Sequence, residues 1–147
     1  MVPEINRLKK KRDFDLIIKH GHWVGGGFLT LKYLELAKIR DYFPKKMDVD
    51  KFEKQLKLAF SVGLKLDKRA VVRNRVRRQI REVARLLIKA ERIKSGYYLM
   101  FVPKSSIKDN TYAEISQEVE LLLQRAGVLA PSVSTQLSSL RQAQGRL

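Results

Sequence analysis

Arginine side chains recur along residues 69 to 85, which read RAVVRNRVRRQIREVAR. Between residues 73 and 85 there are six arginines and a single acidic residue, Glu82. A guanidinium is a planar fork of N–H donors that can bridge two phosphate oxygens, or a phosphate and a base edge. A solvated helix face normally mixes charges of both signs, so that pairs form four residues apart. The excess of one sign therefore favours contact with nucleic acid over a merely solvated face.

A helix over residues 71 to 93 would present these arginines on one side. Its apolar residues fall at helical spacing and cover an arc of about 160°. They are Val72, Val76, Ile80, Val83, Ala84, Leu87 and Ile88. The opposite side carries Asn74, Arg77, Arg78, Arg81, Arg85, Lys89 and Arg92, and Arg73 and Arg75 flank Asn74 in the first turn.

The composition of the whole chain agrees with a polyanionic partner. Its 147 residues include 31 Lys plus Arg, 15 Asp plus Glu and no cysteine, for a formal net charge of +16. Such a charge points first to nucleic acid and second to an acidic membrane surface. The lack of cysteine excludes disulfides, thiolate zinc sites and thiol nucleophiles. No apolar run is long enough to span a membrane, and the N-terminus lacks a signal-peptide pattern, so we expect a cytoplasmic protein.

The sequence offers no catalytic or metal site of its own. His20 and His22 form an H-x-H pair, but no cluster of Asp, Glu or Cys accompanies them. No arrangement of Ser, His and Asp and no pair of carboxylates can be defended. Trp23 is open to two interpretations, of which a packing anchor is favoured over stacking on a base.

Further elements must support the arginine helix. Apolar periodicity and turn residues predict a first helix over 4 to 20 and strands over 28 to 39, 56 to 62 and 97 to 102. A last helix should begin at a capping box formed by Thr111 and Glu114. The glycines at 25 to 27 read as a flexible joint, and residues 40 to 54 as a long connection. The order α-β-β-α-β-α predicts an α+β fold, a small two-layer sandwich. Residues 1–129 would form one domain, and residues 130–147 a polar, disordered tail.

Several segments, taken together, resemble the protein subunit of bacterial ribonuclease P. The run Arg73-Asn74-Arg75 resembles the RNR motif of that family. Similar segments occur in the family's order around Asp13-Phe14, Gly96-Tyr97-Tyr98 and Thr111-Tyr112-Ala113-Glu114-Ile115. The resemblance covers about residues 6 to 127.

The resemblance implies a fold and a function. Family members are small basic α+β proteins with a left-handed βαβ crossover, similar to the ribosomal S5 domain 2-like fold. They pair with a large catalytic RNA, an endonuclease that removes the 5′ leader of precursor tRNA with the help of Mg²⁺. The chain would then be a monomeric protein in a 1:1 ribonucleoprotein that binds ribonuclease P RNA and precursor tRNA, and neither DNA nor membrane.

The resemblance also assigns roles to individual residues. Those expected to lie near the catalytic RNA are Arg73, Asn74, Arg75, Arg77, Arg78, Arg81 and, by its place on the same helix face, Arg85. A cleft between the first helix and the sheet would take the single-stranded leader, with Phe14, Ile18, Tyr33, Lys10 and Arg12 as its residues. Ile18 stands where family members often have a second aromatic side chain.

Two other classes of protein would share some of these features. A ribosomal or other structural RNA-binding protein would share the charge and the sandwich, but it would not need a leader cleft. A DNA-binding regulator could use the arginine helix for recognition, but the short helix and turn that precede a recognition helix are missing.

Overall fold

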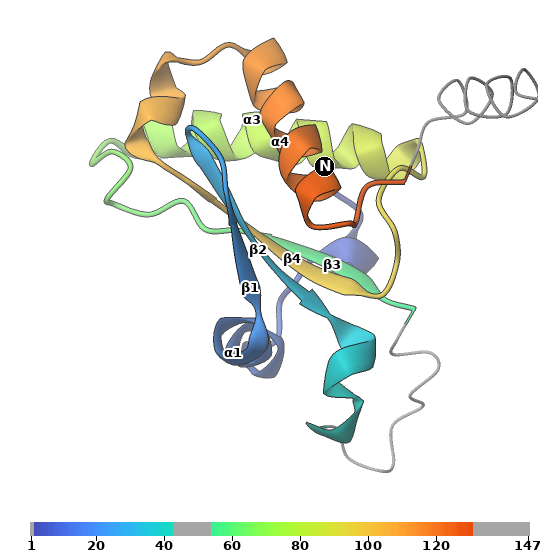
Figure 1. Cartoon of the computed structure of the whole chain (residues 1–147). Coiled ribbons are helices and arrows are strands. Elements are labelled where there is room, and N and C mark those ends of the chain that lie inside the picture. Colours follow the sequence, from blue (N-terminus) through green and yellow to red (C-terminus); the bar gives the residue numbers. More distant parts are fainter. Residues whose placement is uncertain (1, 43–53, 131–147) are drawn as a thin grey trace, which may run out of the picture.

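A four-stranded sheet forms the centre of the fold in the computed structural model, which describes residues 2–42 and 54–130 (Figure 1). Its strands are β1 (His22–Gly25), β2 (Leu29–Glu35), β3 (Leu56–Phe60) and β4 (Tyr97–Pro103). They lie in the order β1-β2-β4-β3. The β1–β2 and β2–β4 pairs are antiparallel, whereas β3 and β4 are parallel.

Three α-helices pack around this sheet. They are α1 (Lys11–His20), α3 (Ala70–Lys89) and α4 (Tyr112–Arg125), and short 3₁₀ helices span Glu4–Asn6, Leu36–Tyr42 and Ser105–Asp109. The predicted α+β class and the order α-β-β-α-β-α are confirmed, with β1 as an additional short strand. The long connection at 40 to 54 lies largely outside the described residues, as does the polar tail at 130–147.

The first helix begins later than the sequence pattern predicts. Residues 4 to 6 form a 3₁₀ turn, and the chain then runs extended as far as Lys10. The Leu8 backbone N–H donates to the Leu58 carbonyl oxygen at 2.8 Å, and Arg7 forms a parallel bridge with Leu58. This pairing places the basic N-terminal segment along the free edge of β3.

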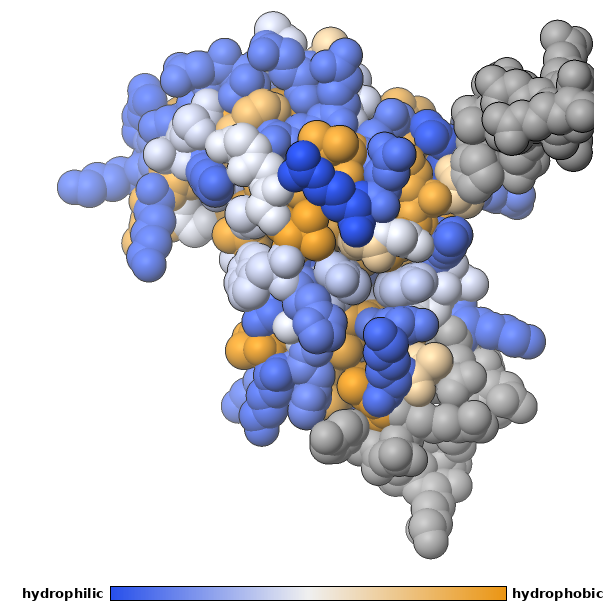
Figure 2. Space-filling model, in the orientation of Figure 1, coloured by the Kyte–Doolittle hydropathy of each residue, from blue (hydrophilic) through white to orange (hydrophobic). Residues whose placement is uncertain are grey.

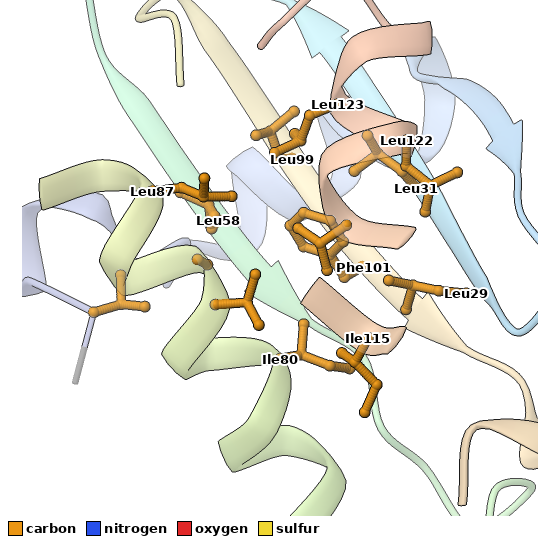
Figure 3. Close-up of a cluster of buried hydrophobic side chains, with 14 of the residues drawn as sticks. Leu29, Leu31, Leu58, Ile80, Leu87, Leu99, Phe101, Ile115, Leu122 and Leu123 are labelled. Atoms are coloured by element: carbon orange, nitrogen blue, oxygen red, sulfur yellow. The ribbon is translucent and has the colours of Figure 1, made fainter. Parts of the chain in front are cut away.

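The main hydrophobic core lies between one face of the sheet and the helices α3 and α4. Alternate strand residues point into it, among them Leu31, Leu58 and Phe101, all at most 2% exposed. The helices contribute the predicted apolar stripe of α3, including Ile80, and Ile115 of α4 (Figure 3). The apolar face of α3 is therefore consumed by the core, which leaves its arginine face to the outside.

A smaller core lies on the opposite face of the sheet, under α1. Ile17 of α1 packs there with Leu34, Tyr98 and Met100. Asp13 is also buried at this place. Burial, followed by the charge of Asp13 and a hydrogen bond to it, raises the pKa of the Tyr98 phenol. This contact anchors the first turns of α1 on the sheet.

The three consecutive glycines form a clasped turn between β1 and β2, in place of the expected loose joint. The Glu118 carboxylate accepts hydrogen bonds from the backbone N–H groups of Gly27 and Phe28, and Arg125 Nη1 donates to the Gly25 carbonyl oxygen at 3.0 Å. A Cβ atom at Gly26 would collide with the Glu118 carboxylate. The close approach of α4 to the turn thus requires a glycine at position 26.

The capping box predicted at the start of α4 is confirmed. The Thr111 hydroxyl accepts from the Glu114 backbone N–H at 3.3 Å, and the Glu114 carboxylate accepts from the Thr111 backbone N–H at 3.0 Å. Hydrogen bonds from the backbone N–H and the hydroxyl of Thr111, and then from Asn110, lower the pKa of Glu114. A carboxylate of lowered pKa adds stability at neutral pH that is lost as the pH falls through its folded-state pKa.

We expect Thr111→Ala to lower the free energy of unfolding by about 1 kcal/mol. The substitution removes the hydroxyl that accepts a hydrogen bond from the Glu114 backbone N–H, which has no partner within the helix. Urea unfolding at neutral pH measures this loss. Thr111→Ser keeps the hydroxyl and should retain most of the stability. Equal stabilities of the alanine variant and the wild type would contradict the capping role.

Candidate nucleic-acid interface

The exposed side of α3 carries cationic side chains, two of which have no acidic partner among the described residues. Arg75 and Arg78 are exposed, and neither makes a hydrogen bond or ion pair with another described residue. Asn74, which precedes Arg75, is exposed as well. Hydrophilic residues cover much of the upper part of the molecule, where α3 and α4 lie (Figure 2). Unpaired guanidiniums on a rigid helix are well placed to bind phosphates.

Other predicted arginines of α3 also serve the protein itself. Arg73 Nη1 donates to the carbonyl oxygens of Asp67 and Lys68, at 3.1 and 2.9 Å. Arg77 donates to the Asn74 side-chain oxygen at 2.9 Å and to the Val62 carbonyl oxygen at 3.1 Å. These bonds fix the turn that leads into α3, so Arg73 and Arg77 have fewer donors left for a ligand.

Arg85, the last of the predicted arginines on this face, forms an ion pair with Glu82, which lies one turn earlier on α3. Its guanidinium donates to both carboxylate oxygens of Glu82, at 2.6 and 3.0 Å. A pair of this kind on a helix surface is worth only a few tenths of a kcal/mol. A phosphate could therefore compete with Glu82 for Arg85 at little cost.

The turn before α3 neutralises its own acidic residue. Asp67 accepts hydrogen bonds from the side chain and the backbone N–H of Arg69, and from Lys108 at 3.2 Å. These contacts hold the pKa of Asp67 well below its usual range, with the Arg69 bonds as the main cause. The carboxylate therefore stays ionised and paired, and it does not cancel the charge of the exposed arginines on α3.

A pocket of about 550 Å³ opens between α1, the N-terminal segment and the β3 edge of the sheet. Aromatic and apolar side chains form its floor, and three cations stand at its wall. The lining residues are Val2, Arg7, Leu8, Lys9, Phe14, Ile18, Leu58, Ala59, Phe60, Ser61, Arg81 and Met100. Aromatic rings beside cations suit a single-stranded nucleic acid, whose bases stack and whose phosphates need neutralising.

Arg81 joins the pocket to the arginine face of α3. Its guanidinium lies over the Phe60 ring at 5.8 Å, and Phe60 is stacked on Phe101 with ring centroids 5.8 Å apart. Burial, and then the charges of Arg77 and Arg7, lower the pKa of Arg81. Mutual repulsion of cations around an apolar floor favours an anionic ligand at this wall.

The structure places two of the five expected cleft residues in this pocket. Phe14 and Ile18 line it, on consecutive turns of α1. Lys10 and Arg12 are exposed at the start of α1 and are not among the lining residues.

Tyr33 lies on the face of the sheet that packs against α3 and α4. The cleft expected to contain it lies between the first helix and the opposite face. Strand residues alternate between faces. Tyr33 follows Leu29 and Leu31 onto the side that packs against α3 and α4, while Lys32 faces α1. The Tyr33 ring instead lies 5.7 Å from the His22 ring, in a separate hollow of about 430 Å³.

Sequence reasoning missed Arg7, Lys9 and Phe60 as pocket residues. Arg7 and Lys9 belong to a basic run that local periodicity assigns to the first helix, and the pairing of residues 7 and 8 with Leu58 brings this run to the pocket. Within the described residues, no group of three or more His, Cys, Asp or Glu side chains is placed to hold a metal ion. None of the helices in that same part of the chain is long and apolar enough to cross a membrane.

These features define a small basic α+β protein in which an arginine-bearing helix adjoins a cation-walled apolar pocket. The chain belongs to the ribonuclease P protein family, because the family model described as Ribonuclease P matches residues 2–127. Membership makes it a subunit of a tRNA-processing ribonuclease and a partner of ribonuclease P RNA.

Individual relatives and solved structures agree with this assignment. The ribonuclease P protein component of a Synechococcus species is 34% identical over 95% of this chain and 92% of its own. That of Clostridioides difficile is 34% identical over 82% and 91%. The Staphylococcus aureus RNase P protein superposes with a TM-score of 0.65 at 26% identity, over 90% of this chain and 98% of its own. The Thermotoga maritima protein, at 21% identity and a TM-score of 0.61, shares the fold over 81% and 96%.

Proposed function

We propose that this chain binds ribonuclease P RNA through the arginine face of α3 and takes the single-stranded 5′ leader of precursor tRNA in the 550 Å³ pocket. In this way it assists the endonucleolytic removal of the leader. One observation carries the proposal: Arg81 belongs both to the arginine face and to the pocket wall, so two RNA segments can be held side by side. The domain that does this is residues 1–129, in a 1:1 complex with the RNA.

The exposed arginines support the contact with the catalytic RNA. Arg75 and Arg78 project from a helix whose other side is packed in the core, so little backbone freedom is lost when they bind. Each phosphate that they neutralise releases counterions, so binding should weaken steeply as the salt concentration rises. Arg73, Asn74, Arg77, Arg81 and Arg85 extend the same surface, in part through donors that also bind the protein.

The pocket supports the contact with the leader. Phe14 and Phe60 bring aromatic rings to the lining, against which bases can pack, and Arg7, Lys9 and Arg81 offer charge to phosphates. Stacking on aromatic rings tolerates any base, which suits leaders of varied sequence. None of the described residues that line the pocket is a histidine, aspartate or glutamate, and we assign no catalytic residue to this chain. The reaction chemistry and Mg²⁺ belong, in this proposal, to the RNA.

We expect Phe14→Ala to raise the dissociation constant for leader-bearing precursor tRNA about tenfold, because one stacked base is worth about 1–3 kcal/mol. The measurement is equilibrium binding to the reconstituted holoenzyme, with mature tRNA lacking a leader as the second ligand. Affinity for mature tRNA should not change.

The matched variant Ile18→Phe adds an aromatic ring to the same wall of the pocket and should tighten binding of the precursor. Equal effects of Phe14→Ala on precursor and mature tRNA would contradict the assignment of this pocket to the leader. An unchanged affinity for both would contradict it as well.

A further inference from the structure

Trp23 is the only tryptophan of the chain, and it lies on β1, one of the two edge strands of the sheet. Its side chain is 57% exposed, which does not fit the packing role favoured from the sequence. Trp23 pairs across β1 and β2 with Lys32, which faces α1, while its neighbour Val24 packs against the main core. The ring therefore stands on the α1 side of the sheet, and α1 also supplies Phe14 and Ile18 to the lining of the pocket.

A buried cation fixes the position of this exposed ring. The Lys32 ammonium lies 5.0 Å from the centroid of the Trp23 ring and donates to the Ile18 carbonyl oxygen at 2.8 Å. Lys32 is only 7% exposed, and a Cβ atom at Gly21 would come within 3.0 Å of its Cγ. One face of the indole is thus held by a cation–π contact in a crowded place, while much of the ring remains open to solvent.

We propose that the open face of Trp23 stacks on an unpaired base of the 5′ leader, beyond the part of the leader held in the pocket. This inference rests on the proposed function. A large rigid ring that is held on one side and exposed on the other is a preorganised stacking platform. The strong positive charge of the chain favours a polyanion as the source of that base over an apolar protein surface.

The position of Trp23 favours the leader over the catalytic RNA as the source of the base. Ile18 lines the pocket with its side chain, and its carbonyl binds the ammonium that holds Trp23. Trp23 lies on β1, the edge of the sheet opposite β3, so a strand that leaves the pocket past Ile18 reaches the indole by crossing the C-terminal end of α1. The arginine face belongs to α3, which packs on the opposite side of the sheet from α1.

The test uses the holoenzyme and two precursors, with leaders of about 4 and about 12 nucleotides, within the range of known single-strand site sizes. Trp23→Ala should raise the dissociation constant of the long-leader precursor about tenfold and leave that of the short-leader precursor unchanged. Trp23→Phe should recover most of the affinity. Tyr112→Ala removes another exposed aromatic, on α4, and should match the wild type.

The fluorescence of Trp23 identifies the source of the base. The long-leader precursor, added to the assembled holoenzyme, should quench it, and the short-leader precursor should not. Quenching already on assembly with ribonuclease P RNA, or equal loss of affinity for both precursors, would overturn the inference in favour of the catalytic RNA. Unchanged binding by Trp23→Ala, together with weakened binding by Phe14→Ala, would overturn it while leaving the proposed function intact. If neither variant weakens binding, the proposed function itself fails.

Discussion

Removal of two exposed arginines from α3 should raise the dissociation constant for ribonuclease P RNA about 100-fold. Arg75 and Arg78 make no hydrogen bond or ion pair with the described part of the protein, so Arg75→Gln with Arg78→Gln removes ligand contacts and no bond within that part. Each lost charge-assisted hydrogen bond is worth about 1.4 kcal/mol or more. Exposed substitutions of this kind change folding stability by less than about 0.5 kcal/mol. Filter binding or fluorescence titration measures the RNA affinity, and urea unfolding measures the stability.

The salt dependence of RNA binding by the same double variant shows whether the RNA contacts a defined surface on α3 or responds only to the net charge of the protein. Loss of two phosphate contacts should lower the slope of log affinity against log salt by about 2. Lys54→Gln with Lys94→Gln removes the same charge from exposed sites near the starts of β3 and β4 and should have a much smaller effect. Equal effects of the two double variants would show that only net charge matters, and would contradict a defined interface on α3.

Phe101→Ala should lower the free energy of unfolding by about 3–5 kcal/mol, the range for truncation of a fully buried phenylalanine. Phe101 is 0% exposed, lies in the main core between the sheet and the helices, and supports the Phe60 ring of the pocket. Since domains are stable by only about 5–15 kcal/mol, much of the stability of the fold would be lost. Urea unfolding followed by far-UV circular dichroism measures the change.

Two further substitutions make this result specific to packing. Phe101→Leu keeps most of the buried volume and should cost less than the alanine variant. Ile5→Ala truncates a side chain that is 79% exposed and should leave the stability nearly unchanged. A loss of less than about 1 kcal/mol for Phe101→Ala would contradict the central place given to this residue.

The arginine helix could be predicted because its signal is local. Val72, Val76 and Ile80 recur with the period of a helix, so the buried face follows from the sequence and the arginine face follows by exclusion. The capping box of α4 is local for the same reason. Neither feature depends on how distant parts of the chain meet.

The pocket could be predicted only in part, because its walls come from segments far apart in the sequence. The family resemblance assigns Phe14 and Ile18 to the cleft, but Arg7 and Phe60 meet only because residues 7 and 8 pair with Leu58. Tyr33, also expected in the cleft, lies on the side of β2 that faces α3 and α4. The three preceding glycines carry no side-chain pattern from which the register of the strand can be read.

Cleavage of precursor tRNA by ribonuclease P RNA at low Mg²⁺, with and without this protein, tests the central claim most directly. We expect accurate removal of the 5′ leader that appears only when the protein is added, and no cleavage by the protein alone. The Arg75→Gln, Arg78→Gln double variant should need a much higher protein concentration for the same stimulation. Tight, salt-sensitive binding to a cognate RNA without any stimulation of leader removal would contradict the claim.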